Sequence, residues 1–237
     1  MKIFAIADLH LSFNESINKP MWVFGDDWEN HTERLKKAWE EMVSDEDIVL
    51  IPGDISWALR LEDAMPDFEW IQKLPGTKIL SKGNHDLWWS RIKYMNSLYE
   101  DMVFLQNESY HVEGEKIAIC ATRGWPYPGS DDYTDHDEKI YKRELLRLKM
   151  GLDSAVKKAP DAKIIVALHY PPAGQNGPET EFTKMLEKYG VWKCVYGHLH
   201  GQIAFGKGIK GNYKGVEYSL VSLDYLNAKP KLLYDGN

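Results

Sequence analysis

Short apolar runs, most of them four to six residues long, recur along the chain and are almost free of polar residues. Such runs are typical of strands that are covered on both faces. They predict seven strands, at Lys2–Ala7, Asp47–Ile51, Thr77–Ser81, Lys116–Ala121, Lys163–Leu168, Lys193–Tyr196 and Val216–Ser222. Apolar residues spaced three or four apart predict helices over His31–Ser44 and Asp137–Lys158. Strands that alternate with helices predict an α/β domain, and the Gly- and Lys-rich stretch Gly201–Gly215 predicts hairpins towards the C-terminal end.

The length and composition favour one folded domain over residues 1–237. A chain of 237 residues, of which 43% are hydrophobic, can bury a core without disulfides or a structural metal. Its cysteines, Cys120 and Cys194, lie apart in strand-like runs, which indicates small core residues and not a disulfide framework. No apolar run is long enough to cross a membrane, and Asp8 ends the apolar N-terminus too early for a signal peptide. We therefore expect a cytoplasmic protein.

The charge balance restricts the partners that the chain can bind. Its 29 Lys and Arg residues against 36 Asp and Glu residues give a formal net charge of −7. This balance argues against the binding of extended duplex nucleic acid, which requires a basic face. It does not exclude a local site in which metal ions supply the positive charge. The chain also carries eight histidines, and their positions indicate where such a site would be.

Side chains that can bind metals follow five of the predicted strands, directly after each apolar run. They stand in the blocks Asp8-Leu9-His10, Gly53-Asp54, Gly83-Asn84-His85-Asp86, His169 and Gly197-His198-Leu199-His200. In open α/β sheets, ligand sites lie beyond the carboxyl ends of the strands. Core packing gives no reason for Asp or His at the end of strand after strand. We therefore expect these side chains to form one site.

The chemistry of these residues predicts a metal centre. Asp, His and Asn side chains bind divalent ions such as Mn, Fe, Zn, Ni and Co. In an extended segment Asp8 and His10 would point the same way, and His198 and His200 would do so too. The candidate ligands are Asp8, His10, Asp54, Asn84, His169, His198 and His200. They are too many for one tetrahedral ion and suit two ions that share a carboxylate and clamp a phosphoryl group.

Taken together and in this order, the five blocks resemble the signature of the calcineurin-like metallophosphoesterases, and among them the small phosphohydrolases of prokaryotic type. The blocks run from residue 8 to residue 200, which is most of the chain. The resemblance implies an α/β fold, a four-layer α/β/β/α sandwich with two mixed β-sheets. It implies hydrolysis of phosphate mono- or diesters, with two divalent metal ions as cofactors and a small-molecule phosphate ester as substrate.

The positions within the blocks imply a role for each residue. By resemblance, one ion is bound by Asp8, His10, Asp54 and His200, and the other by Asp54, Asn84, His169 and His198, with Asp54 as the bridge. His85 is similar to the family's non-ligand histidine, which protonates the leaving oxygen or stabilises its charge while a metal-bound hydroxide attacks phosphorus. Asp86 would orient the His85 imidazole and raise its pKa.

Differences between this sequence and the motifs of particular branches of the family narrow the range of expected activities. Protein Ser/Thr phosphatases continue the second block with Asp-Arg-Gly and end the third with Glu, whereas this chain has Ile55 after Asp54 and Asp86 at the third block's end. The lipid A pathway pyrophosphatase has Arg where His85 stands. Both activities are disfavoured. The alternatives are a nuclease of the same superfamily, whose additional DNA-binding region would have little room here, and a catalytically silent scaffold that binds partner proteins. The complete ligand set together with His85 favours the enzyme.

The remaining residues near the blocks are given structural interpretations first. His31, His111 and His136 are predicted to be structural. Most of the tryptophans that flank the blocks are predicted to be packing residues, with an aromatic wall that stacks on a ring of the substrate as the alternative; they are Trp57, Trp88, Trp89 and Trp125. Arg123 is interpreted either as a phosphate contact or as a structural arginine. Specificity is expected from loops over the metals, at Leu11–Asn30, Arg123–Asp137 and Pro171–Thr180.

Overall fold

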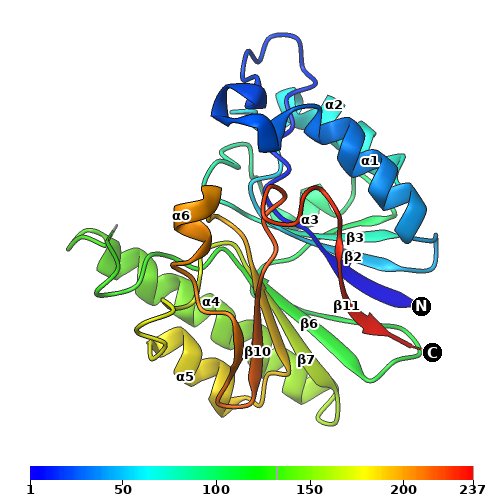
Figure 1. Ribbon diagram of the computed structural model, residues 1–237. Coiled ribbons are helices and arrows are strands. Elements are labelled where there is room, and N and C mark those ends of the chain that lie inside the picture. The colour runs from blue at the N-terminus through cyan, green and yellow to red at the C-terminus, as the bar shows by residue number, and fades with distance from the viewer. Residues whose placement is uncertain (132, 237) are drawn as a thin grey trace. The chain divides into compact units, whose positions relative to one another are not determined.

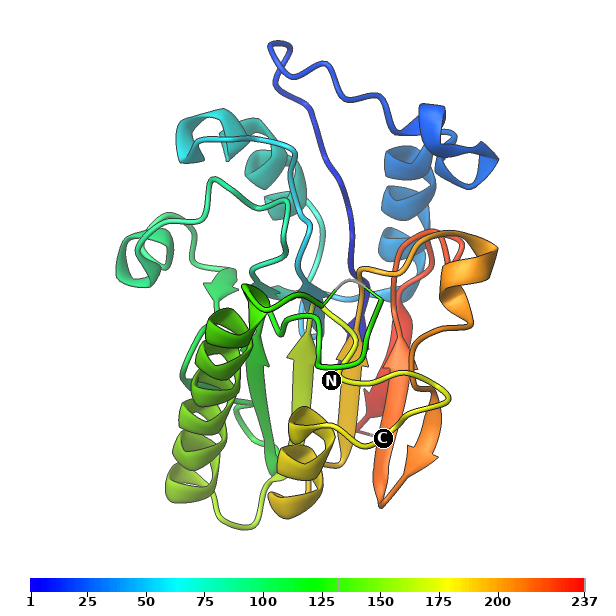
Figure 2. The same ribbon diagram turned by 90° about the vertical axis from the view of Figure 1, so that its left-hand side faces the viewer.

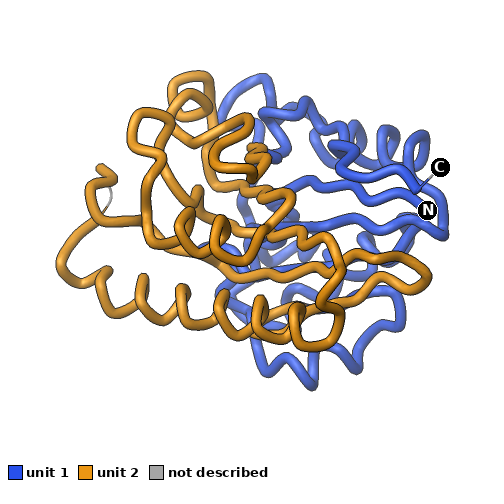
Figure 3. The backbone as a smooth tube through the Cα atoms, turned by 90° about the horizontal axis from the view of Figure 1, so that it is seen from below, with its two compact units in different colours: residues 1–104, 221–237 blue, residues 105–220 orange. Residues whose placement is uncertain are grey.

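The computed structural model describes residues 1–131 and 133–236, and the chain divides into two compact units. Unit 1 comprises Met1–Phe104 and Val221–Asn237, and unit 2 comprises Leu105–Leu220 (Figure 3). Unit 2 is therefore one continuous stretch of chain inserted into unit 1. The single domain expected from length and composition stays a prediction.

Unit 1 contains a five-stranded mixed sheet with the order β11-β1-β2-β3-β4. Its strands are β1 (Lys2–Ala5), β2 (Ile48–Pro52), β3 (Thr77–Ser81), β4 (Met102–Phe104) and β11 (Lys231–Asp235). Neighbours from β1 to β4 are parallel, and β11 pairs antiparallel with β1 at the edge. The carboxyl ends of β1, β2 and β3 consequently point the same way, so that the residues that follow them meet at one edge of the sheet.

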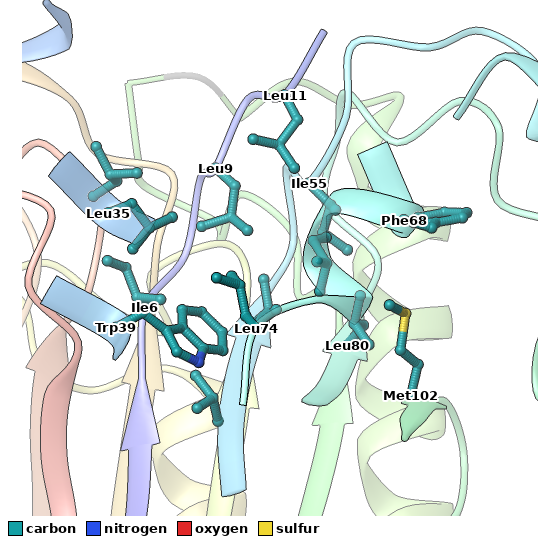
Figure 4. Close-up of a cluster of buried hydrophobic side chains, with 14 of the residues drawn as sticks. Ile6, Leu9, Leu11, Leu35, Trp39, Ile55, Phe68, Leu74, Leu80 and Met102 are labelled. Carbon is teal, nitrogen blue, oxygen red and sulfur yellow. The ribbon is translucent and has the colours of Figure 1, made fainter. Parts of the chain in front are cut away.

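The helices of unit 1 pack on this sheet through a shared apolar cluster. They are α1 (His31–Met42), α2 (Leu61–Gln72) and the short α3 (Ile92–Met95), and two 3-10 turns, η1 (Met21–Phe24) and η2 (Asp26–Trp28), precede α1. α1 buries the stripe Leu35, Ala38 and Trp39, as its periodicity predicted. Leu35 and Trp39 join Phe68 of α2 and Leu80 of β3 in the cluster (Figure 4). Burial of this apolar surface anchors both helices to the strands.

Unit 2 contains a six-stranded mixed sheet with the order β5-β6-β7-β8-β10-β9. Its strands are β5 (Ser109–His111), β6 (Ile117–Thr122), β7 (Lys163–Leu168), β8 (Lys193–Tyr196), β9 (Gly211–Tyr213) and β10 (Val216–Leu220). The inner four strands are parallel neighbours, and an antiparallel strand closes each edge. Here too the residues that follow the parallel strands β6, β7 and β8 lie at one edge.

Two helices cover one face of the unit 2 sheet (Figure 2). These are α4 (Asp137–Lys158) and α5 (Glu181–Lys188), and α6 (Gly201–Phe205) follows β8 (Figure 1). α4 has the bounds that its apolar stripe predicted, and it buries Tyr141, Leu148 and Leu152 against the strands. α5 begins with a capping box, in which Thr180 and Thr183 each accept the other's backbone N–H.

The α/β class with two mixed sheets is confirmed. All seven predicted strands are present, but β1 ends at Ala5 and β10 at Leu220, two residues earlier than predicted in each case. The predicted hairpin is also present, because β9 and β10 pair antiparallel. Within the part of the chain that the structure describes, no helix has the length and the apolar character needed to cross a membrane. The four-layer arrangement stays a prediction.

Candidate metal centre

The segments that carry Asp8, His10 and Asp54 are bound to each other through their backbones. The Asp8 N–H donates to the Gly53 carbonyl over 3.0 Å, and the His10 N–H donates to the Asp54 carbonyl over 3.0 Å. These bonds continue the pairing of β1 with β2 beyond the strand ends. The chain beyond β1 and the chain beyond β2 therefore act as one support for the three side chains.

The same support is anchored in the core. The buried apolar cluster of unit 1 includes three residues next to the candidate ligands in sequence. These are Leu9, Leu11 and Ile55 (Figure 4). All three are fully buried. A displacement of this backbone would expose their side chains, so the positions of Asp8, His10 and Asp54 are tied to core packing.

The prediction that Asp8 and His10 lie in an extended segment is wrong. Asp8 has φ of 63° and His10 has φ of 45°, both in the left-handed region, and Asp54 also lies there with φ of 52°. Each such conformation costs a side-chain-bearing residue about 1–3 kcal/mol. It persists where the surroundings fix it, and strained residues of this kind cluster at functional sites. In unit 2, His198 has φ of 71°.

The glycine before Asn84 allows a close approach of two loops. A Cβ added to Gly83 would lie 2.1 Å from Asp54 Oδ1 and 2.2 Å from the Asp54 nitrogen, which no side chain tolerates. The next residue but one, His85, donates its backbone N–H to Asp54 Oδ1 over 2.8 Å. The loop after β3 thus lies directly against the Asp54 carboxylate, and Asn84 stands in that loop.

In unit 1, Asp8 lies within metal-binding distance of two other candidate ligands. Ligand atoms of Asp8 lie within 4.8 Å of ligand atoms of His10 and of Asp54. His10 Nε2 is 3.8 Å from Asp54 Oδ2. The exposed fractions are 0% for Asp8, 3% for His10 and 1% for Asp54. Two buried carboxylates at this separation repel each other, and a divalent cation between them would remove the repulsion. The donor set therefore fits a first-row divalent ion.

Asp86 holds the Asp54 loop and does not orient His85, so the expected role is wrong. Its carboxylate accepts backbone N–H groups from Asp54 (2.9 Å), Ile55 (2.9 Å), Ser56 (3.2 Å) and Gly83 (2.7 Å), and the indole N–H of Trp88 (3.1 Å). Among the described residues, none of its hydrogen bonds comes from the His85 ring. Burial and the Asp54 charge raise the pKa of Asp86 to about 7, while its backbone donors act in the opposite direction.

The His85 ring lies against Trp57 at the surface of unit 1. The two ring centroids are 4.4 Å apart, and Trp57 also stacks on His10 at 4.7 Å with an interplanar angle of 23°. His85 Nε2 is 4.0 Å from Asp54 Oδ2, and the His85 side chain is 44% exposed. One indole therefore contacts a candidate ligand and the candidate proton donor, and the imidazole can still reach a substrate.

In unit 2, His169 and His198 come together beyond β7 and β8. Their ring centroids are 5.1 Å apart, and His169 is fully buried. The Gly197 N–H donates to the His169 carbonyl over 3.1 Å, which joins the ends of the two strands. Tyr170 lies against the His198 ring at 4.2 Å. His200 is half-buried and directly precedes α6 in an extended conformation.

Arg123 has a structural environment in unit 2. Its carbonyl accepts the backbone N–H groups of His169 (3.0 Å) and Tyr170 (2.9 Å). Its guanidinium lies 4.2 Å from the centre of the Trp125 ring and 3.9 Å from the buried Glu144 carboxylate. Burial lowers the pKa of Arg123 despite that carboxylate. These contacts support the structural interpretation of the two that the sequence left open.

Two further residues support the unit 1 ligands through contacts that the sequence does not specify. Packing is the interpretation that the sequence favours for most of the flanking tryptophans, and the hint that Trp57 contacts a candidate ligand is its position three residues after Asp54. His31 was interpreted as structural without a partner. Its Nε2 lies 3.1 Å from the carbonyl of Leu9, between Asp8 and His10, and burial lowers its pKa. No sequence pattern indicates either contact, because both depend on loop geometry.

Comparison with known proteins identifies the family. Residues 1–202 match the calcineurin-like phosphoesterases. The chain belongs to this family. Membership of this family implies divalent metal ions as cofactors, and the Asp and His clusters of the structure could bind such ions.

Individual relatives are more distant. Over 80 residues the chain is 36% identical to the Gene 66 protein of Mycobacterium phage L5, a match that spans 34% of this chain and 37% of that relative. The phosphopantetheinyl hydrolase PptH of Mycobacterium tuberculosis has a similar structure over 100% of this chain and 98% of its own, with 15% identity and a TM-score of 0.55. AQ665 of Aquifex aeolicus, a protein of unknown function, is similar over 98% of this chain and 95% of its own, with 16% identity and a TM-score of 0.48. The likeness to PptH supports the fold.

Proposed function

We propose that the protein is a dinuclear metal-dependent hydrolase of phosphate mono- or diesters. The observation that carries the proposal is that ligand atoms of Asp8 lie within 4.8 Å of those of His10 and of those of Asp54 in unit 1, and that all three residues are buried and have left-handed backbone. Membership of the calcineurin-like phosphoesterases supports it independently. A scaffold that only binds partner proteins would have no use for this cluster at its conformational cost.

The proposal assigns four ligands to each ion. Asp8, His10, Asp54 and His200 would hold one ion, and Asp54, Asn84, His169 and His198 the other. The contact between the His169 and His198 rings supports their assignment to one ion. Bound ions supply positive charge to the phosphate and a water acidic enough to attack it. Mn, Fe, Zn, Ni and Co all suit oxygen and imidazole ligands.

The chain itself would position and protonate the leaving group. The backbone bond from His85 to Asp54 fixes the start of the His85 side chain beside a carboxylate that the proposal assigns to both ions. The Trp57 indole limits the rotation of the imidazole. His85 would donate a proton to the leaving oxygen as the ester bond breaks, a contribution of about 10²–10⁴ in rate for a well-placed acid.

Substitution of His85 and Asp54 separates chemistry from metal binding. His85→Ala is expected to keep its metal content and lose about 10²–10⁴ in kcat on p-nitrophenyl phosphate and bis-p-nitrophenyl phosphate. Asp54→Asn is expected to lose both metal and activity. The measurements are elemental analysis of the purified proteins and steady-state rates with Mn, Zn, Ni and Fe. His111→Ala, which removes a half-buried histidine of β5, is the matched control and should change neither.

The results decide between the candidate functions. An unchanged rate in His85→Ala would remove His85 from the mechanism. A wild-type protein that binds no ion under manganese supplementation would rule out the metal centre. Metal binding without hydrolysis of any ester would favour the scaffold.

A further inference from the structure

Unit 2 has a cavity of about 700 Å³ beside His198. It is formed by three segments, residues 126–131 after β6, residues 170–177 after β7 and residues 198–208 after β8, and we call it the three-loop cavity. Each segment follows the carboxyl end of a parallel strand of the unit 2 sheet. Sites that hold small molecules have volumes of about 300–1,000 Å³, so the three-loop cavity has the size of a ligand site.

Backbone hydrogen bonds hold two of the three segments together. The Gln175 N–H donates to the Lys207 carbonyl over 2.8 Å, and the Ile209 N–H donates to the Ala173 carbonyl over 3.1 Å. Gly174 and Gly208 form an antiparallel bridge between these bonds. The Lys210 N–H donates to the side-chain oxygen of Gln175 over 3.0 Å. The wall is therefore formed before any ligand binds, and a preformed wall lowers the entropic cost of binding.

The two bridging glycines leave space for tyrosine side chains. A Cβ added to Gly174 would lie 2.7 Å from the hydroxyl oxygen of Tyr127, and one added to Gly208 would lie 2.5 Å from the hydroxyl oxygen of Tyr196. Any other residue at either position would displace a ring. Tyr127 lines the three-loop cavity, so the glycine at 174 determines how that ring forms the wall.

The lining is neutral and mostly apolar. Among the described lining residues only Asp131 and Lys207 carry charges, and these two form an ion pair of 2.9 Å. Tyr127, Tyr170 and Ile203 supply ring and aliphatic surface, and Ile203 is 86% exposed. A charged ligand group would lose its hydration in this cavity without gaining a partner, which disfavours it. The lining therefore favours a neutral group with apolar faces.

Polar groups at fixed positions add hydrogen-bonding capacity. The oxygen of Gln175 is already bonded to Lys210, which orients its amide N–H₂ group as a donor. Ser130 also lines the cavity, and its buried hydroxyl has no hydrogen-bond partner among the described residues. Buried hydroxyls are normally satisfied, so a ligand atom is expected to pair with it. A planar ring would pack against the apolar walls, and polar atoms on its edge would form hydrogen bonds with the Gln175 amide and the Ser130 hydroxyl.

We propose that the three-loop cavity binds the alcohol part of the substrate, and that this part is a neutral, ring-bearing group of nucleoside size. The inference rests on the proposed function. His198 links the three-loop cavity to the proposed metal centre, because it lines the cavity and is a proposed metal ligand. An ester whose phosphate lies at the ions would extend past His198 along Tyr170, whose ring contacts the imidazole at 4.2 Å. A phosphorylated serine side chain would leave the cavity unfilled.

Binding of the free alcohol tests the cavity without any catalysis. Adenosine, guanosine and uridine are titrated into the metal-loaded protein and followed by calorimetry. Ile203→Asp removes an exposed apolar contact and is expected to weaken binding at least about fivefold. Gly177→Phe adds a ring where an added Cβ meets no heavy atom within 4 Å, and should weaken binding at least about tenfold. Leu146→Asp, on α4 outside the cavity and 58% exposed, is the matched control and should bind as wild type.

Hydrolysis of two matched esters tests whether the cavity also binds the ring-bearing group of the substrate during the reaction. Adenosine 5′-monophosphate and ribose 5-phosphate carry the same primary ester and differ in the base. The wild type is expected to hydrolyse the nucleotide with a kcat/KM at least about tenfold higher. This ratio should fall towards one in Ile203→Asp and Gly177→Phe and remain unchanged in Leu146→Asp.

The two measurements separate failure of the cavity from failure of the proposed function. Hydrolysis of both esters at equal rates without nucleoside binding would overturn the cavity assignment and leave the hydrolase standing. Nucleoside binding that the cavity variants weaken, without hydrolysis of either ester, would overturn the proposed function and support the cavity as a binding site. If no nucleoside binds and neither ester reacts, both are wrong.

Discussion

In unit 1 the indole of Trp57 contacts both a candidate ligand and the candidate acid. Its ring centroid is 4.7 Å from that of His10 and 4.4 Å from that of His85. Trp57→Ala is expected to lower kcat on a generic phosphate ester at least about tenfold, because a misplaced acid loses rate steeply with distance. Trp57→Phe keeps a ring against both imidazoles and should recover most of that rate. Steady-state kinetics at matched metal occupancy measure the effect.

A comparable tryptophan controls for general loss of stability. Trp70 is half-buried and packs against the same apolar cluster as Trp57. Trp70→Ala should lower the free energy of unfolding and leave kcat of the folded enzyme unchanged. Equal losses of kcat in the two alanine variants would show that Trp57 acts only through packing and does not position His85.

At the scale of residues, sequence reasoning could identify candidate ligands but not their conformation. Asp8 and Asp54 stand out because each follows an apolar run, and that signal is local. Their left-handed φ angles depend on bonds to another segment, such as the one from the Asp8 N–H to the Gly53 carbonyl. The hydrogen-bond partners of Asp86 could not be predicted from the sequence either. Its neighbour in sequence is His85, but its donors come from the Asp54 loop and from Gly83 and Trp88.

At the scale of elements, Asp47 joins the turn after α1 to the first residue of β1. Its carboxylate accepts the Lys2 N–H over 2.6 Å and the N–H and hydroxyl of Ser44, each over 2.8 Å. Burial of Asp47 acts to raise its pKa, but these donors lower it by more, so that the pKa lies below its ordinary value. Asp47→Asn is expected to lower the free energy of unfolding by about 1–2 kcal/mol at neutral pH, because the amide cannot accept from all three donors.

The sign of the pH dependence follows from the lowered pKa. The ionised carboxylate stabilises the fold at pH values above the ordinary carboxyl pKa, about 3.9, and this contribution is lost as the pH falls through the lower folded value. The difference between wild type and Asp47→Asn should therefore shrink in acid. Urea denaturation at several pH values measures it, with the exposed Asp45→Asn as control. A difference that grows as the pH falls would contradict the sign.

Central strands were predictable and edge strands were not. β2 and β7 are nearly continuous apolar runs because both of their faces are covered. β4, β5 and β9 are three residues long and carry partly exposed side chains, so pairing and not composition makes them strands. α2 was missed as well. It contains Pro66, which removes one backbone donor, and tertiary packing of Phe68 and Ile71 outweighs that loss.

At the scale of the whole molecule, the proposed ligands are divided between the two units. Asp8, His10, Asp54 and Asn84 belong to unit 1, whereas His169, His198 and His200 belong to unit 2. The chain passes from unit 1 to unit 2 after Phe104 and returns after Leu220. Ions held by these ligands would add to the stability of the folded chain, because they bind the folded state and not the unfolded chain.

Removal of metal should therefore destabilise the entire protein. At an ion concentration of about 100 times Kd, binding contributes roughly 2.7 kcal/mol per site, and a chain of this size gains about 2–4 °C in Tm per kcal/mol. For two sites, treatment with a chelator is expected to lower Tm by roughly 10–20 °C in a calorimetric scan, and the return of manganese should restore it. Asp54→Asn lacks the proposed bridging ligand, so its Tm should be low already and nearly insensitive to the chelator. A wild-type Tm that does not change on chelation, in protein shown by elemental analysis to have lost its ions, would mean that the ions do not couple to folding. The ligands would then be held in place by the protein alone, through bonds such as those that Asp86 accepts from the Asp54 loop.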